Sequence, residues 1–251
     1  MIELEHLTKR YGAFTAVNDL CLRVEPGEIF AFLGPNGAGK TTTIRMMMGL
    51  LRPTSGSIRL CGYDLSAEPI QAKRLSGFVP DRPFLYEKLT GLELLRFCAD
   101  LYEMDPARAE DRIREHLELF DLTSWRGELI ESYSHGMKQR LAFAAALIHE
   151  PKLLVVDEPM VGMDPRGARV LRALLRSLSE RGTTIFLSTH SLEIAEALSD
   201  RIGIIQQAEL IAVGSLDELR ARAGHTGRLE EIFLRLTGAE DLVEVIEALR
   251  A

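Results

Sequence analysis

A glycine-rich run that ends in a lysine and a threonine is the most specific chemical pattern in the chain. Gly34-Pro35-Asn36-Gly37-Ala38-Gly39-Lys40-Thr41 has the spacing G-x-x-x-x-G-K-[ST], with an apolar run before it and a helical pattern at residues 42–50 after it. Glycines let several backbone N–H groups converge on one point, and the positive end of the following helix strengthens their attraction for phosphate oxygens. Lys40 then reaches the β- and γ-phosphates, and the Thr41 hydroxyl binds Mg²⁺. An ordinary glycine-rich turn is the alternative, but the strand–loop–helix context favours a nucleoside triphosphate site.

Two carboxylates follow a second apolar run. Residues 153–156 are continuously apolar, which is typical of a strand buried in a parallel sheet, and Asp157 and Glu158 come directly after them. Ligand sites in open α/β sheets lie at this carboxyl edge of the strands. A later apolar run at residues 184–188 ends at Thr189-His190. A phosphate loop, an acidic strand end and a later histidine recur in several classes of nucleotide hydrolase, so these residues alone do not name a family.

The elements that position these residues alternate along the chain. After the phosphate loop, strands alternate with helices, which predicts a mainly parallel sheet. Before the loop, residues 2–7 and 17–24 form short strands that we expect to pair antiparallel. Helical spacing runs from residue 91 to about 148, with Asp105-Pro106 as a helix start inside it and a further helix expected from Met137 to His149. The expected fold class is therefore α/β, a P-loop NTPase core with an antiparallel β subdomain and an inserted helical subdomain.

Composition sets the broad class of protein. The chain has 251 residues, of which 46% are hydrophobic and 27% charged, as in a soluble globular protein with room for a proper core. No apolar stretch approaches the length of a membrane span, and the first residues lack the basic and apolar regions of a signal peptide, so we expect a cytoplasmic protein. A net charge of -7 argues against a general affinity for nucleic acid, and no nucleic-acid partner is expected.

A third segment decides which family the chain resembles. Tyr133-Ser134-His135-Gly136-Met137-Lys138-Gln139-Arg140 stands shortly before the acidic strand end. Val161-Gly162-Met163-Asp164-Pro165 and Ser188-Thr189-His190 follow that strand end. This order resembles the ATP-binding-cassette (ABC) ATPases, and the resemblance covers nearly the whole chain. It implies an ATP-binding domain over residues 1–218, with the helical subdomain at about 84–150. A C-terminal tail over 219–251 carries two helical patterns, at residues 229–236 and 242–249, and we expect it to dock on the core, with contact to a partner or a membrane as the alternative.

The resemblance gives each site residue a role toward ATP and Mg²⁺. Asp157 and Thr41 would hold Mg²⁺, Glu158 would activate the attacking water, and His190 would contact the γ-phosphate and help place that water. Tyr11, which by itself is more often packing, would stack on adenine. The expected nucleotide contacts are Tyr11, Gly34, Pro35, Asn36, Gly37, Ala38, Gly39, Lys40, Thr41, Thr42, Ser134, Gly136 and Asp164.

The same resemblance implies a second ATPase subunit. In the family, ATP on one subunit is capped by the signature segment of another, and here Ser134 and Gly136 would supply that cap. The common signature is Leu-Ser-Gly-Gly-Gln, so the usual glutamine is replaced by Met137. Asp81 stands where the family has the glutamine of its Q-loop; it would bind Mg²⁺ or its water through oxygen, but it cannot donate as an amide does. The partner would be a second copy or a similar cassette.

Further matches point to one branch of the family. Residues 78–81, 85–91 and 229–238 resemble the branch that serves two-gene, export-type transporters of bacteria. That implies a permease in a separate chain, which would place this protein on the inner face of the membrane, and a docking surface at residues 81–89 instead of a merely solvated loop. A non-transport ABC ATPase acting on nucleic acid or ribosomes is the alternative, although the chain lacks paired cassettes and basic extensions. A P-loop kinase is a weaker alternative, because it needs neither Ser134 nor His190.

Overall fold

A six-stranded sheet carries the phosphate loop at the carboxyl end of an inner strand. The computed structural model describes residues 1–160 and 165–238. The strand order is β10-β9-β3-β8-β7-β6, and all neighbours pair in parallel except the β9–β10 hairpin. These strands are β3 (Ile29–Leu33), β6 (Ser76–Val79), β7 (Leu153–Asp157), β8 (Thr184–Thr189), β9 (Arg201–Gln206) and β10 (Glu209–Gly214). Every residue of β3, β7 and β8 is buried, as the apolar runs predict.

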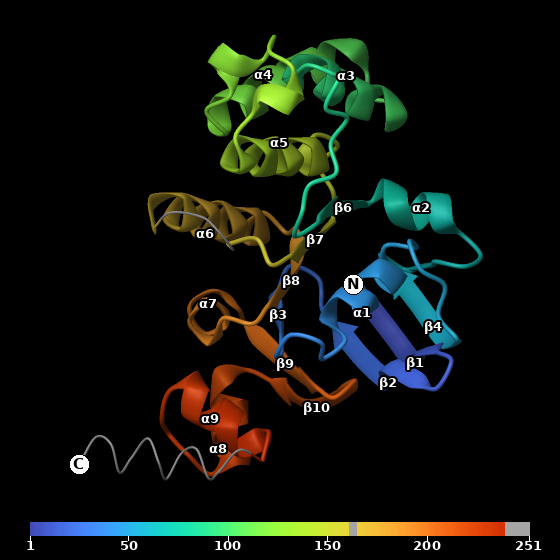
Figure 1. The fold of residues 1–251 in the computed structure, drawn as a ribbon, viewed down its shortest axis with the longest axis vertical. Helices are drawn as coiled ribbons and strands as arrows, with labels where there is room; N and C mark the ends of the chain where they lie inside the picture. The colour runs from blue at the N-terminus through green and yellow to red at the C-terminus, as the bar shows by residue number, and fades with distance from the viewer. Residues whose placement is uncertain (161–164, 239–251) are drawn as a thin grey trace.

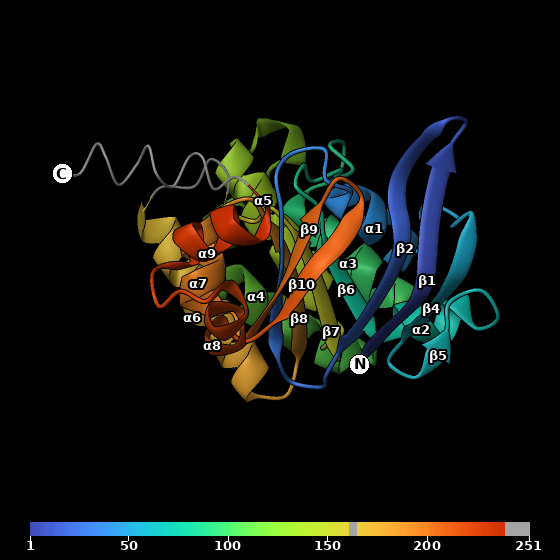
Figure 2. The same ribbon diagram turned by 90° about the horizontal axis from the view of Figure 1, so that it is seen from below.

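A four-stranded antiparallel sheet lies beside this core. Its order is β2-β1-β4-β5, and it forms from β1 (Ile2–Tyr11), β2 (Phe14–Val24), β4 (Ser55–Leu60) and β5 (Tyr63–Asp64). Helix α1 (Lys40–Met47) packs between the two sheets, since its buried methionines share one apolar cluster with side chains of β1, β3 and β7. Figure 2 shows this sheet on one side of the β9–β10 hairpin, with the last helices on the other. The predicted antiparallel opening and mainly parallel core are confirmed.

A helical lobe stands above the sheet edge that ends in β6 (Figure 1). It contains α3 (Gly91–Leu101), α4 (Pro106–Leu119), η1 (Thr123–Trp125), η2 (Ile130–Ser132) and α5 (His135–Leu147). Thr90 forms a capping box with Glu93 at the start of α3, and the side chain of Asp105 caps α4, which begins with Pro106 as expected. The inserted helical region is thus confirmed, and one apolar cluster joins it to β7 and β8.

The remaining helices flank the core. They are α2 (Pro69–Arg74), α6 (Pro165–Glu180), α7 (Leu192–Leu198), α8 (Leu216–Ala223) and α9 (Leu229–Leu236). Leu219, Leu229 and Ile232 are buried against side chains of β3, β9 and β10, so the tail docks on the core as far as residue 238. The second helical pattern of the tail, at residues 242–249, lies outside the described residues. In the part of the chain that the structure describes, no helix has the length and apolar character needed to cross a membrane.

Two helices begin earlier than their patterns predict. Helix α1 starts at Lys40 instead of residue 42, because Gly39 takes a left-handed φ of 113° that turns the loop directly into the helix. Helix α5 starts at His135 instead of Met137, because the Ser134 side chain caps it. Helix α2 was not predicted; its six residues are too few for a periodic pattern to appear.

Candidate ATP-binding site

The phosphate loop is shaped by close backbone contacts that only glycine allows. A Cβ at Gly34 would lie 2.3 Å from the carbonyl oxygen of Ile205, and one at Gly39 would lie 2.5 Å from that of Ala16. The Gly34 N–H donates to the Thr189 carbonyl at 3.3 Å, which ties the loop to the end of β8. The loop is therefore wedged between the β9–β10 hairpin and β2, with its backbone held in one conformation.

Lys40 lies buried between the loop and the acidic strand end. Its side chain is 6% exposed, and its Nζ donates to the Gly34 carbonyl at 2.6 Å. The same Nζ lies 3.5 Å from Oε1 of Glu158. A buried ammonium group in this position needs anionic partners, and the phosphates of a nucleotide are the partners that the loop is built to receive.

Asp157 ends β7 in a buried, polar niche. It is 3% exposed and accepts a short hydrogen bond from the Ser188 hydroxyl on β8. Burial raises the pKa of Asp157 above its ordinary value, hydrogen bonds from Ser188 and Thr41 oppose that shift, and the charges of Glu158 and Asp81 add to it. A cation beside Asp157 would offset this desolvation and repulsion, so the carboxylate and the Thr41 hydroxyl form a site suited to a hard divalent ion.

Glu158 connects the lysine to the histidine that the sequence singles out. Its side chain is 14% exposed, and its Oε2 lies 2.9 Å from Nδ1 of His190, while Oε1 faces Lys40. Its backbone takes a left-handed φ of 48°, and its N–H donates to the Ser188 carbonyl at 3.1 Å. The structure thus brings Lys40, Glu158 and His190 together at the carboxyl edge of β3, β7 and β8.

A magnesium site here would share its ligands with the nucleotide. Among the described residues there is no group of three or more His, Cys, Asp or Glu side chains that could hold a metal ion alone. Mg²⁺ in nucleotide sites characteristically takes one or two protein oxygens and completes its shell with phosphates and water. Thr41 and Asp157 match that requirement. Asp81, which follows β6, is exposed and close enough for its charge to raise the pKa of Asp157.

The signature segment lies on the helical lobe, apart from the phosphate loop. Ser134, His135 and Gly136 are exposed at the start of α5, and the Ser134 hydroxyl accepts from the Met137 N–H at 3.3 Å. Within the described residues, no hydrogen bond or ion pair joins Ser134 or Gly136 to residues 34–41. Tyr11 is also exposed, at 51%, at the end of β1. Its ring lies 5.2 Å from Nζ of Lys9.

Comparison with known proteins identifies the family. The family model described as "ABC transporter" matches residues 17–161. The linearmycin resistance ATP-binding protein LnrL of Bacillus subtilis is 42% identical over 224 residues, which cover 89% of this chain and 72% of LnrL. The bacitracin transport ATP-binding protein BcrA of Bacillus licheniformis is 41% identical over 223 residues, covering 88% of this chain and 72% of BcrA.

The chain belongs to the ABC transporter family. A solved ATP-binding subunit of an ABC transporter superposes with a TM-score of 0.90 at 35% identity, covering 94% of this chain and 99% of that one. A dimeric ATP-binding cassette in a post-hydrolysis state, bound to ADP and Pi, gives a TM-score of 0.79 at 26% identity, covering 86% of this chain and 99% of that one. As a member of this family, the protein is an ATP-binding and ATP-hydrolysing transporter subunit.

Two residues that support this ABC ATPase site were not predicted from the sequence, and one predicted site residue is not described by the structure. Asp164, expected near the nucleotide, falls outside the described residues. Two supporting residues were not predicted as site residues: Ser188, which holds Asp157, and Gln139, which is buried on α5 and bonded to the Pro159 carbonyl. Ser188 has only its place at a strand end as a signal, and Gln139 only its place in the signature segment.

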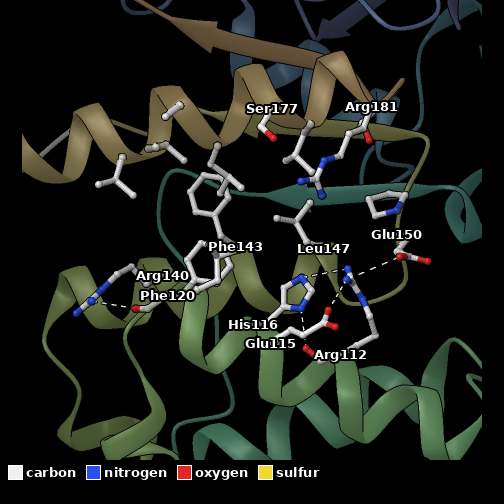
Figure 3. A pocket seen from close by; sticks show the side chains of 18 of the residues that line it. Arg112, Glu115, His116, Phe120, Arg140, Phe143, Leu147, Glu150, Ser177 and Arg181 are labelled. Carbon is white, nitrogen blue, oxygen red and sulfur yellow. Dashed lines mark hydrogen bonds and ion pairs between the residues drawn. The ribbon is translucent and has the colours of Figure 1, made fainter.

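A large groove lies beside this ABC signature helix (Figure 3). It has a volume of about 1450 Å³ and runs between α4 and α5 on one side and α6 on the other. Arg112 lines it and pairs with Glu115 and Glu150, and Phe120 and Phe143 supply an apolar wall. Gly136 of the signature segment lines the groove, whereas no residue of the phosphate loop does.

Proposed function

We propose that this ABC ATPase drives an export-type transporter whose permease is a separate chain, and that two ATPase subunits close around ATP. One observation carries the proposal: the phosphate-binding and acidic groups lie together on the core, while the exposed Ser134 cap lies on the helical lobe without contact to them. A complete site therefore needs a second surface. The relatives support the choice of transport, since one is named for bacitracin transport and another for linearmycin resistance.

In this proposal the core supplies the chemistry of hydrolysis. The loop N–H groups and Lys40 bind the phosphates, and Thr41 with Asp157 holds Mg²⁺, to which Asp81 adds an oxygen directly or through water. Magnesium supplies charge neutralisation on the phosphates when it is bound. Glu158 takes up a proton from the attacking water, and His190, held at 2.9 Å from Glu158, orients that water against the γ-phosphate. The exposed ring of Tyr11 stacks on adenine.

The helical lobe supplies the closure. The hydroxyl of Ser134, the backbone at Gly136 and the positive end of α5 cap the γ-phosphate of the ATP on the second subunit. Asp164 is proposed as a further contact to the nucleotide. The second subunit is another copy of this chain or a similar cassette. A dimeric assembly is supported by the related ATP-binding cassette, whose structure is dimeric in a post-hydrolysis state bound to ADP and Pi.

The permease docks where the core meets the helical lobe. Phe84 is 93% exposed and Tyr86 is 63% exposed, and the ring of Tyr86 packs edge-on against Phe97 at 5.7 Å. Leu101 adds a further exposed apolar side chain at 67%. Exposed apolar residues gathered in this way mark a binding surface. Docking here holds the protein on the inner face of the membrane and includes Asp81, which links the permease to the metal site.

The proposal treats residues 1–218 as the ATPase domain, with its helical subdomain at about 84–150, and residues 219–251 as a tail. Helix α8, which spans the boundary at residue 218, and helix α9 pack against β3, β9 and β10 at the end of the core (Figure 1). We assign the tail no part in ATP chemistry.

Replacing the proposed base tests this function directly. Glu158→Gln removes the proton acceptor and keeps the shape, so we expect steady-state ATP hydrolysis to fall by about a hundredfold or more. ATP should then hold two subunits together, and light scattering after size exclusion should show a dimer that appears only with ATP and Mg²⁺. Glu180→Gln is the control, because Glu180 is an exposed carboxylate at the end of α6. Unchanged turnover in Glu158→Gln would remove Glu158 from its role.

A further inference from the structure

One buried side chain joins the signature helix to the proposed base. Gln139 on α5 is 1% exposed, and its Nε2 donates to the carbonyl oxygen of Pro159 at 2.7 Å. Pro159 directly follows Glu158. The other amide atom, Oε1, is buried with no hydrogen-bond partner among the described residues. The contact therefore crosses from the helical lobe to the core at the residue next to the reacting groups.

The turn at Glu158 depends on few anchors. Glu158 has a left-handed φ of 48°, which is uncommon for a residue with a side chain. Its own N–H is held by the Ser188 carbonyl on β8. Pro159 has no N–H, so its carbonyl is the only backbone hydrogen-bonding group that it can offer, and Gln139 occupies it. Without Gln139, one side of the turn that directs the Glu158 carboxylate toward His190 is released.

The unpartnered Oε1 atom argues against a purely structural role for Gln139. Burying an amide oxygen without a partner carries a free-energy cost, and an apolar side chain of similar length would fill the same space without it. A glutamine retained at that cost supplies something that an apolar side chain lacks, which is the N–H donor to Pro159.

We propose that Gln139 is a positioning residue for ATP hydrolysis, which fixes the turn after Glu158 so that its carboxylate meets the attacking water. Because Gln139 lies on the helix that Ser134 caps, the same bond links the cap for one ATP to the base for the other. This inference rests on the proposed role of Glu158. It concerns the chemical step, so it affects kcat and leaves ATP binding unchanged.

The first test removes the donor and keeps the packing. In Gln139→Met we expect kcat to fall about tenfold, since the hydrogen bond that fixes the turn after Glu158 is lost and the proposed base is less well placed. The KM for ATP and the affinity for a fluorescent ATP analogue should stay within about twofold. The Tm should change little, because the cost of losing the bond to Pro159 is offset by removal of the unpartnered oxygen. Leu141→Met, a buried apolar change on the same helix, controls for repacking and should keep the wild-type kcat.

The second test asks whether Gln139 acts through Glu158. In a Glu158→Gln background, single-turnover hydrolysis is followed over hours, and adding Gln139→Met should lower the residual rate by less than about twofold. Gln139→Leu repeats both measurements with a different apolar side chain, in case the methionine variant folds poorly. A kcat within twofold of wild type in the single variants, or the same loss in both backgrounds, would overturn the inference. Full turnover in Glu158→Gln alone would instead overturn the proposed base.

Discussion

The core and the helical lobe prepare their parts of the ATP site in opposite ways. On the core, Lys40 and Asp157 are 6% and 3% exposed. Lys40 bonds to the phosphate loop and lies beside Glu158, and Asp157 accepts from Ser188 on β8. On the lobe, Ser134 and Gly136 are exposed at the start of α5, and the described bond of the Ser134 side chain is the local cap of its own helix. The core thus carries a preorganised chemical centre, whereas the helical lobe carries an accessible surface that can bind a ligand.

The burial of the core groups and the exposure of the cap each have a physical reason. Charges that stabilise a transition state act most strongly when they are fixed and shielded from water, which the buried core provides. A cap that must engage and release a second subunit has to stay accessible, and a helix N-terminus offers N–H groups without a buried charge. In the proposed dimer, ATP joins the two kinds of surface.

The largest expected effect comes from disabling each side separately. Lys40→Ala removes the buried ammonium group, and Ser134→Arg puts a bulky side chain where the cap should meet ATP. Each variant alone should lose about a hundredfold or more of its ATP turnover. Mixed together, the two should recover about a quarter of wild-type turnover, because half of randomly formed dimers are mixed and each has one intact site. ATPase rates of the mixture and of each variant at equal total protein measure this.

A control shows whether recovery depends on complementary sites. Mixing Lys40→Ala with a Lys40→Ala and Ser134→Arg double variant leaves no intact site in any dimer, so its rate should stay at background. If the first mixture also stays at background although the subunits exchange, the division of the site between two subunits is wrong.

Sequence predicted the chemical centre more fully than its supports. The spacing at Gly34–Lys40, the buried run before Asp157 and the strand end at His190 each place a group at one sheet edge, because parallel strands bring their carboxyl ends together. The mainly parallel core and the helical insertion follow from the same alternation. These features are local in sequence and leave a pattern.

Hydrogen bonds that join distant segments of the chain leave no such pattern in the sequence. The bond from Gln139 to Pro159 joins residues 20 positions apart, and the bond from Ser188 to Asp157 joins residues 31 apart. Each depends on the final packing of two elements. Helix α2 is too short for a period, and the start of α1 depends on the backbone conformation of Gly39, which a glycine permits but does not require. The roles of Tyr11, Ser134 and Asp81 stay predictions.

A smaller effect is expected at Asp81, the exposed carboxylate on the core side. Asp81→Ala removes an oxygen that would reach Mg²⁺ directly or through water, so the free Mg²⁺ concentration for half-maximal ATPase activity should rise about threefold to tenfold. Turnover at saturating Mg²⁺ should change less. Titrating Mg²⁺ at fixed ATP measures both, with Asp217→Asn, an exposed carboxylate on α8, as the control. An unchanged Mg²⁺ dependence would exclude Asp81 as a magnesium ligand and leave the buried groups of the core as the metal site.

The far end of α5 should affect stability and leave the chemistry unchanged. Just beyond this end, His149 stacks on Tyr102 with ring centroids 3.6 Å apart, and its Nε2 lies 3.3 Å from the Ser76 carbonyl. Burial lowers the pKa of His149 to about 4, against a smaller opposing effect of the Ser76 hydrogen bond. Between about pH 6.5 and pH 4, His149 therefore binds a proton in the unfolded chain but not in the folded chain. The free energy of unfolding is highest above about pH 6.5 and falls as the pH drops toward 4.

His149→Phe keeps an aromatic ring beside Tyr102 and removes the titrating group. The drop in Tm between pH 7 and pH 5 should then be smaller in the variant than in the wild type, by about 4–8 °C, while ATP turnover at pH 7 stays within about twofold. Thermal unfolding at both pH values measures the difference. An equal drop in both proteins would exclude His149 as the source. A loss of turnover would mean that this buried end of α5, like its exposed start, takes part in the ATP cycle.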